Sequence, residues 1–214
     1  MEAINRYIEL NTIETLLLLS CFVLITITKI AHEIRFQTFM ELFISNKYLK
    51  IYGKDQNLNF GTFNILLFFV QVIVFGFFVR FVGYYFGYPL EYNILIIIIG
   101  IALIILFKYY LEKLIAVIFN IDFFTELYNF HKVSYRSLIS IVILPLITLL
   151  VYSPLDKKTV ILITIILFIV LNSIAFVLTL KNQQKLILNN LFYFILYLCA
   201  LEISPYLIAF KLVF

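Results

Sequence analysis

The stretch ILIIIIGIALIILF, residues 94–107, decides the fold of this chain, because it contains no polar side chain. A continuously apolar run of this kind suits a helix that crosses a lipid bilayer, whereas a membrane β-strand would alternate apolar and polar residues. The whole chain is 64% hydrophobic and only 13% charged, against about 25% charged residues in soluble domains. The sequence therefore predicts an all-α protein whose solvent is lipid.

Similar apolar runs lie on both sides of this stretch. We predict six transmembrane helices, at residues 12–28, 60–82, 92–107, 135–152, 159–180 and 190–209. Most of these runs approach the ~20 residues that a helix needs to cross ~30 Å of hydrocarbon. No Pro-, Gly- or Ser-rich linker separates them, so we expect residues 1–214 to form a single integral membrane domain.

The basic residues predict the orientation. Of 16 Lys and Arg residues, 11 follow the first, third and fifth predicted spans, and 5 lie on the other side. Cytoplasmic loops carry the excess of Lys and Arg. We therefore expect a multi-pass protein of the bacterial inner membrane with both termini in the periplasm.

The connection after the first span carries an amphipathic pattern. Apolar residues recur at helical spacing, at Phe36, Phe39, Met40, Phe43 and Ile44. This pattern predicts a short helix lying in the membrane surface. It serves either as an anchor at the headgroup level or as a docking surface for a partner protein.

A second, briefer pattern of the same kind follows the third span. Phe123, Phe124, Leu127 and Tyr128 carry it, and they predict another short interfacial helix.

Glu202 is the most informative polar residue, because it lies inside the last apolar run. An ionisable side chain at that depth is costly and marks function or partner contact more often than chance. Three interpretations remain open: a proton or cation site, a neutral hydrogen-bond donor between helices, and a contact for another subunit.

Other polar positions at similar depth extend this hypothesis. We predict an intramembrane polar cluster of Glu202, Gln71 and Asn172, with Tyr206 one helical turn from Glu202 and Pro205 freeing a backbone carbonyl beside it. Interhelical hydrogen bonds of this kind contribute about 0.6–2 kcal/mol each.

The histidines and one glycine pair give weaker signals. His32 and His131 lack the spacing of a helical metal site, and Gly83-x-x-x-Gly87 fits either helix packing or a tight turn. No nucleotide-binding, nucleophile or cysteine-metal motif is present, and no basic stretch suggests nucleic acid. We therefore expect no catalytic residues, no cofactor, no metal and no nucleic-acid partner.

The last apolar run also carries a resemblance. Tyr197-Leu198-Cys199, followed by Glu202 and Pro205, resembles the closing signature of an uncharacterised family of multi-pass inner-membrane proteins from Bacteroidota. The resemblance implies a six-helix core and an inner-membrane location. By lineage it also suggests the inner-membrane parts of the type 9 secretion and gliding machinery as partners.

These observations favour a non-enzymatic accessory or scaffold subunit of a larger membrane complex, with the bilayer and other membrane subunits as its partners. The alternative is a small transporter or proton-coupled subunit that works through Glu202. A third interpretation is a lipid-modifying enzyme with its site near His131 and Glu126.

Overall fold

The structure, a computed structural model, describes residues 12–53, 61–87, 93–119, 122–153 and 156–182. These residues form seven helices and no strand: α1 (Thr12–Ala31), α2 (Glu33–Met40), α3 (Lys47–Tyr52), α4 (Thr62–Tyr85), α5 (Ile94–Phe119), α6 (Asp122–Tyr152) and α7 (Lys157–Asn182). The predicted all-helical class is confirmed for the part of the chain that the structure describes.

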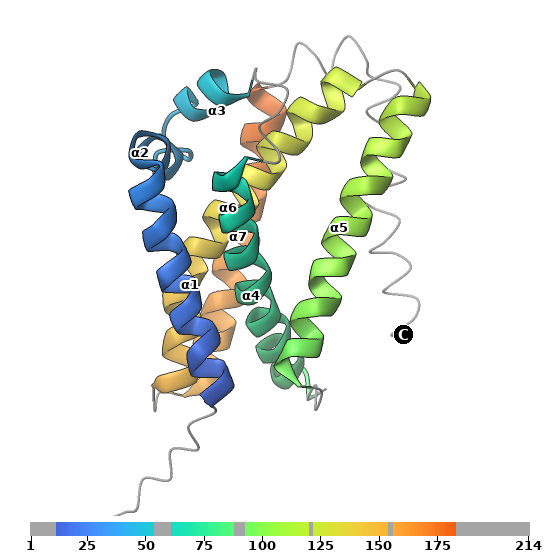
Figure 1. Cartoon of the computed structure of the whole chain (residues 1–214). Helices are drawn as coiled ribbons and strands as arrows, with labels where there is room; N and C mark the ends of the chain where they lie inside the picture. The colour runs from blue at the N-terminus through green and yellow to red at the C-terminus, as the bar shows by residue number, and fades with distance from the viewer. Residues whose placement is uncertain (1–11, 54–60, 88–92, 120–121, 154–155, 183–214) are drawn as a thin grey trace, which may run out of the picture.

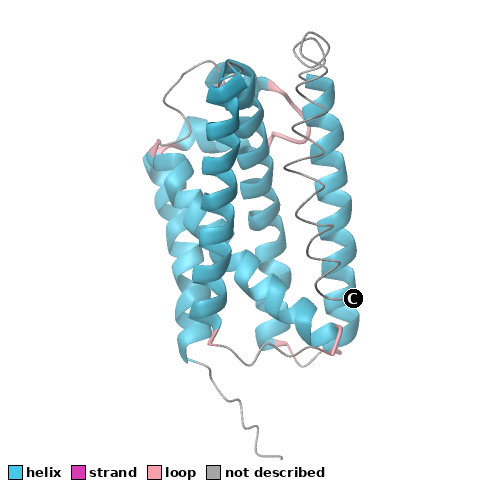
Figure 2. Cartoon of the chain, turned by 90° about the vertical axis from the view of Figure 1, so that its right-hand side faces the viewer, coloured by secondary structure: helices cyan, strands magenta, loops and turns pink. Residues whose placement is uncertain are grey.

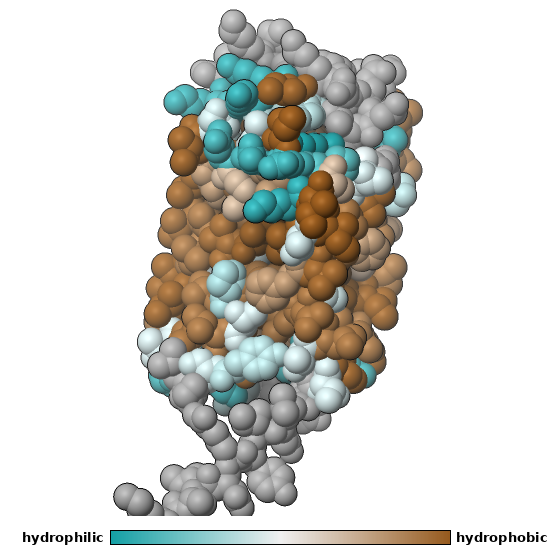
Figure 3. All heavy atoms as spheres, turned by 60° about the vertical axis from the view of Figure 1, so that its left-hand side comes forward, coloured by the Kyte–Doolittle hydropathy of each residue, from teal (hydrophilic) through white to brown (hydrophobic). Residues whose placement is uncertain are grey.

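Five helices, α1, α4, α5, α6 and α7, are long and apolar enough to cross a membrane. They run alternately up and down in one bundle, while α2 and α3 lie across one end of it (Figures 1 and 2). Figure 3 shows an apolar band around the middle of the bundle and polar side chains gathered at the end that carries α2 and α3. Five of the six predicted spans are thus confirmed as long apolar helices, and the sixth, residues 190–209, lies outside the described residues.

The core of the bundle lies between α4 and α6. The apolar 18-residue stretch of α6 buries 56% of its residues and that of α4 39%, the two largest shares among the five helices. Apolar side chains from both helices form this core: Leu67, Val70, Val74 and Phe77 from α4, and Leu138, Ile139, Ile143 and Ile147 from α6. Lipid is as apolar as these side chains, so close packing rather than the hydrophobic effect holds them together.

The helix α5 differs from its prediction in length and lies at the margin of the bundle. It continues to Phe119 instead of ending at residue 107, because good helix formers extend the apolar run. Only 6% of its apolar 18-residue stretch is buried. It meets α4 closely where Gly76 faces Ile98, and Figure 1 shows it diverging from α4 toward the other end.

The second predicted interfacial helix is wrong as a separate element. Leu127 and Tyr128 belong to the first turns of α6, which continues without a break from Asp122 to Tyr152. No glycine or proline interrupts the chain between residues 122 and 144, so the helix propagates through both predicted segments. At about 1.5 Å per residue, the 31 residues of α6 exceed the thickness of the hydrocarbon core.

The first predicted amphipathic helix is shorter than its pattern. α2 ends at Met40, so Phe43 and Ile44 lie beyond it. Phe36 and Phe39 are buried within the protein, whereas Met40 and Ile44 are exposed. The aromatic stripe therefore packs mainly on the bundle.

The aromatic neighbours that bury this stripe come from other elements. Phe39 meets Tyr48 of α3 and Phe63 of α4 edge-to-face, each with ring centroids 5.5 Å apart. Phe43 packs near Tyr135 of α6 at 5.7 Å. Such aromatic pairs are stabilising beyond the area that they bury, which explains why the stripe faces protein.

The turn after α4 resolves one of the open alternatives. Gly87 has φ +79°, in the region that favours glycine. Its N–H donates to the carbonyl of Tyr84, at the end of the helix. The position thus supports the tight-turn interpretation of the Gly83-x-x-x-Gly87 pattern.

Candidate functional site

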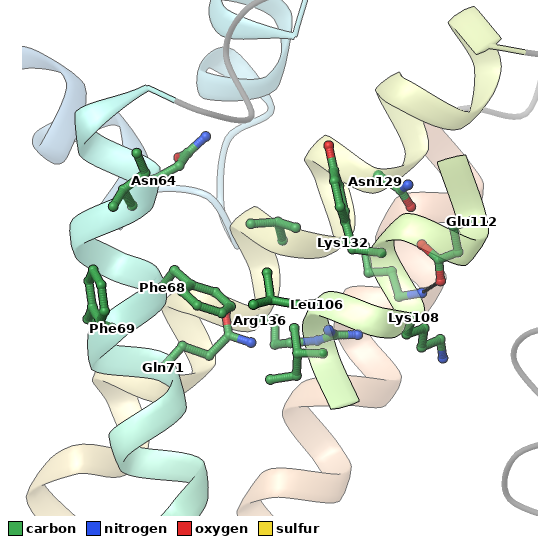
Figure 4. Close-up of a pocket in the computed structure, with 14 residues that line it drawn as sticks. Asn64, Phe68, Phe69, Gln71, Leu106, Lys108, Glu112, Asn129, Lys132 and Arg136 are labelled. Carbon is green, nitrogen blue, oxygen red and sulfur yellow. Dashed lines mark hydrogen bonds and ion pairs between the residues drawn. The ribbon is translucent and has the colours of Figure 1, made fainter. Parts of the chain in front are cut away.

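A cavity of about 180 Å³ lies between α4, α5 and α6, toward the end of the bundle that carries α2 and α3. Its walls are mostly apolar, with polar and charged side chains among them (Figure 4). The polar and charged residues are Asn64 and Gln71 from α4, Lys108, Tyr109 and Glu112 from α5, and Asn129, Lys132 and Arg136 from α6. Three of the four charged residues are cationic, so the lining carries a net positive charge.

One ion pair crosses this cavity. Lys132 of α6 donates to Glu112 of α5 at 2.8 Å, as the dashed line in Figure 4 marks. The Glu112 side chain is 3% exposed and that of Lys132 15%. Removing one partner of a buried pair leaves an uncompensated charge, so this contact ties α5 to α6.

Arg136 follows Lys132 by one turn of α6 and also lines the cavity. It is half-buried. Among the described residues, no hydrogen bond or ion pair satisfies its guanidinium group. A cation in this position is costly without an anionic partner.

Asn129 lies one turn before Lys132 on the same face of α6. It is 4% exposed, and its buried Oδ1 accepts no hydrogen bond. Buried polar atoms are nearly always satisfied, so each exception needs an explanation. Asn129 and Arg136 together give the cavity an unused acceptor and an unused cationic donor.

Gln71, predicted from its depth, lies at the bottom of the labelled group in Figure 4. It is 1% exposed, and Ser137 of α6 donates to its Oε1 at 3.4 Å. The partner that the structure shows is Ser137, which the sequence analysis did not select. The predicted cluster of Gln71 with Asn172 and Glu202 stays a prediction.

Asn172 lies on a different cavity. It is exposed on α7 and donates to the carbonyl of Phe168 in its own helix at 2.8 Å. It lines a cavity between α6 and α7 of about 220 Å³, together with Tyr135, Lys132 and Arg136. No hydrogen bond joins Asn172 to Gln71, but each lines a cavity that Arg136 also borders.

Glu202, Pro205 and Tyr206 lie outside the described residues. Their place in a polar cluster stays a prediction.

A separate cationic contact fastens α2 to the bundle. The guanidinium group of Arg35 lies 4.5 Å from the ring centre of Phe63 and 4.9 Å from that of Tyr52, and it reaches Tyr48 and Asn64 at 3.4 and 3.5 Å. Burial raises the pKa of the Tyr48 phenol above its usual value of 10, and the nearby charge of Arg35 offsets only part of this effect. This arrangement serves packing, because aromatic rings cover the charge.

The histidines show no joint site. His131 is 4% exposed, and its Nδ1 has no hydrogen-bond partner, while Glu126 of the same helix is exposed. His32 pairs with the Thr62 hydroxyl at 3.0 Å. In the part of the chain that the structure describes, no group of three or more His, Cys, Asp or Glu residues could hold a metal ion.

Sequence reasoning missed Lys132, Arg136 and Asn129 as site residues. It placed Lys132 in the connection before the fourth span, because that span was drawn only from residue 135, and it counted Arg136, at the start of the span, with the basic residues of the same connection. Positions 129, 132 and 136 have helical spacing, and this spacing could have identified them as one face of the helix that continues into the fourth span.

Comparison with known proteins gives one match. A family model described as a domain of unknown function, DUF4271, matches residues 15–213. No curated protein and no solved structure matches the chain.

Proposed function

We propose that this chain, which belongs to the DUF4271 family, is a non-enzymatic accessory or scaffold subunit of a larger assembly in the bacterial inner membrane. Its role is then to hold other membrane subunits through helix contacts within the bilayer. Partners from secretion or gliding machinery, which the sequence resemblance suggests, are the first to examine.

The outer face of α5 is the observation that carries this proposal. Large apolar side chains follow one another along it at helical spacing and are more than half exposed: Ile96, Ile99, Leu103, Phe107, Tyr110 and Leu114. We call this set the α5 stripe. A Cβ built at Gly100, which lies beside the stripe, meets no atom within 4 Å. Small residues let two membrane helices approach closely, so Gly100 offers a notch to a helix of another subunit.

The distribution of charge supports the proposed orientation. Lys29, Arg35, Lys47, Lys50 and Lys181 lie at the end of the bundle that carries α2 and α3, whereas Arg80, Lys157 and Lys158 lie at the opposite end. By the positive-inside rule, the first end faces the cytoplasm. The N-terminus of α1 then faces the periplasm, and a periplasmic C-terminus further requires the predicted sixth span.

Affinity purification from the native host in a mild detergent, with mass spectrometry of the recovered proteins, tests the proposal. We expect a stoichiometric membrane partner with the wild type and its loss with Gly100→Phe, which fills the notch. A wild-type protein recovered alone would contradict the scaffold role.

The matched control is Val170→Phe, which adds the same ring to an exposed position on α7. It should retain the partner. Equal loss with both variants would show that added aromatic bulk, and not the α5 stripe, is responsible.

The alternative of proton transfer through Glu202 has no specific support from the described residues, since Glu202 lies outside them. It stays a prediction.

A further inference from the structure

We propose that the cavity between α4, α5 and α6 binds the phosphate headgroup of an anionic membrane lipid, with Arg136 as its principal counter-charge. We call this cavity the α4–α5–α6 cavity. The proposal is independent of the α5 stripe, because that stripe lies on the outer face of α5.

The depth of Arg136 in the membrane suits contact with a lipid headgroup. A hydrocarbon core of about 30 Å takes about 20 residues of helix. Counted back from the end of α6 at Tyr152, it reaches Lys132, and Arg136 then lies about one turn inside. A basic side chain at this level, close to the headgroups, can reach a lipid phosphate by extending toward the interface.

The charge balance of the cavity favours binding of an anion. Glu112 is paired with Lys132, and no other carboxylate lines the cavity among the described residues. Arg136 therefore lacks an anion there. A phosphate matches the planar guanidinium group with two parallel hydrogen bonds.

A second polar group of the cavity, on Asn129, suits the part of a lipid headgroup beyond the phosphate. The buried Oδ1 of Asn129 lacks a donor, and a headgroup with a hydroxyl or ammonium group provides one. The phosphate satisfies Arg136, and the donor satisfies Asn129. Phosphatidylglycerol supplies both groups, the phosphate and a hydroxyl donor, and it keeps a net negative charge.

The apolar walls accommodate the rest of the lipid. Ile65, Phe68, Phe69, Ile105 and Leu106 line the cavity. Phe69 is 53% exposed and Leu106 40%, so the cavity opens sideways between α4 and α5 toward the membrane. A lipid can then place its headgroup among the polar side chains and its acyl chains along these residues. Basic pockets between transmembrane helices are a recognised way to bind anionic headgroups.

Native mass spectrometry of the purified full-length protein tests this assignment. The protein is titrated with phosphatidylglycerol and, in parallel, with phosphatidylcholine. We expect the wild type to retain phosphatidylglycerol selectively and Arg136→Gln to bind it at least about tenfold more weakly, because the variant loses the charge-assisted hydrogen bonds to the phosphate. Arg136→Lys, which keeps the charge, should retain part of the selectivity.

The control is Lys158→Gln, which removes one positive charge at the opposite end of the bundle. It should bind phosphatidylglycerol as the wild type does. Size-exclusion chromatography and circular dichroism check that each variant is folded, and Arg136→Lys keeps the test decisive should Arg136→Gln fail to fold.

Four outcomes would overturn the proposal. Equal loss with Arg136→Gln and Lys158→Gln would indicate general charge attraction. Equal retention of both lipids would remove the anionic specificity. Displacement of phosphatidylglycerol by inorganic phosphate at the same concentration would assign the site to a soluble anion. Selective binding that appears only with Glu202→Gln would show that the chain itself supplies the counter-charge.

Discussion

At the scale of single residues, three cationic side chains of the described bundle are held by specific contacts. Arg35 is covered by aromatic rings from α3 and α4, and Lys132 is paired with Glu112. Arg80 of α4 is paired with Glu14 of α1 near the opposite end. Arg136 differs from these three, which is why it marks the candidate site.

Tyr48 gives a residue-scale prediction. Because burial raises the pKa of its phenol in the folded state, the folded protein holds this proton more tightly than the unfolded chain. The associated stability is fully present below the unfolded pKa of about 10 and is lost as the pH rises through the higher folded pKa.

We therefore expect the free energy of unfolding to fall above about pH 10, and the fall to be smaller in Tyr48→Phe. Unfolding of the detergent-solubilised protein, followed by circular dichroism from pH 8 to 11, measures this. Tyr110→Phe, exposed on α5, is the control for loss of a hydroxyl group. A Tyr48→Phe profile identical to the wild type would refute the assignment.

Sequence reasoning performed unevenly at this scale. Gln71 was selected because one amide inside an apolar run is conspicuous, and its partner in the structure is Ser137, which no local pattern indicated. The aromatic cover of Arg35 was not predicted, because its rings come from Tyr52 and Phe63, which are distant in the chain. Such contacts depend on tertiary packing, and a local pattern does not report them.

At the scale of elements, the contact between α4 and α5 depends on one glycine. A Cβ at Gly76 would lie 2.5 Å from Cγ1 of Ile98, closer than two non-bonded carbon atoms can approach. The side chain of Ile98 therefore occupies the space that a side chain at position 76 would need, and α4 and α5 pack closely at this level.

We predict that Gly76→Ala destabilises the protein by about 1–3 kcal/mol, the usual range for overpacking, despite the better helix propensity of alanine. Gly100→Ala is the matched control, since a Cβ there meets nothing, and it should be neutral or slightly stabilising. Unfolding titrations in sodium dodecyl sulfate measure both. Equal stability of the two variants would argue against a close α4–α5 contact.

Element boundaries were harder to predict than element identity. Each of the five described spans was expected from its apolar run, but α5 and α6 extend well beyond those runs. Charged residues such as Lys108 and Lys132 suggested loops. A helix can nevertheless continue through such a residue when the charged group reaches the membrane surface or a partner. The amphipathic pattern of α2 showed helical spacing correctly but not which surface the apolar face would meet.

At the scale of the whole molecule, the alternating helices fix which ends of the spans share a side of the membrane. Only the side that faces the cytoplasm remains to be measured. Positions at the two ends of the bundle, such as Lys50 and Lys158, are suited to this purpose.

We predict that, in intact cells, a membrane-impermeant maleimide labels Lys158→Cys and does not label Lys50→Cys. Each variant is made in a background with Cys21→Ala and Cys199→Ala, and labelling after permeabilisation confirms that both sites react. The reverse pattern would invert the orientation and place the α4–α5–α6 cavity on the periplasmic side.

The length of α6 has a consequence for the behaviour of the protein in different lipids. A helix of 31 residues spans about 46 Å, more than any ordinary hydrocarbon layer. In short-chain lipids, Lys132 and Arg136 would emerge into the aqueous boundary. In long-chain lipids, both cations would lie deeper in the hydrocarbon. Because Lys132 is already paired with Glu112, acyl-chain length alone would tune how strongly Arg136 requires an anion.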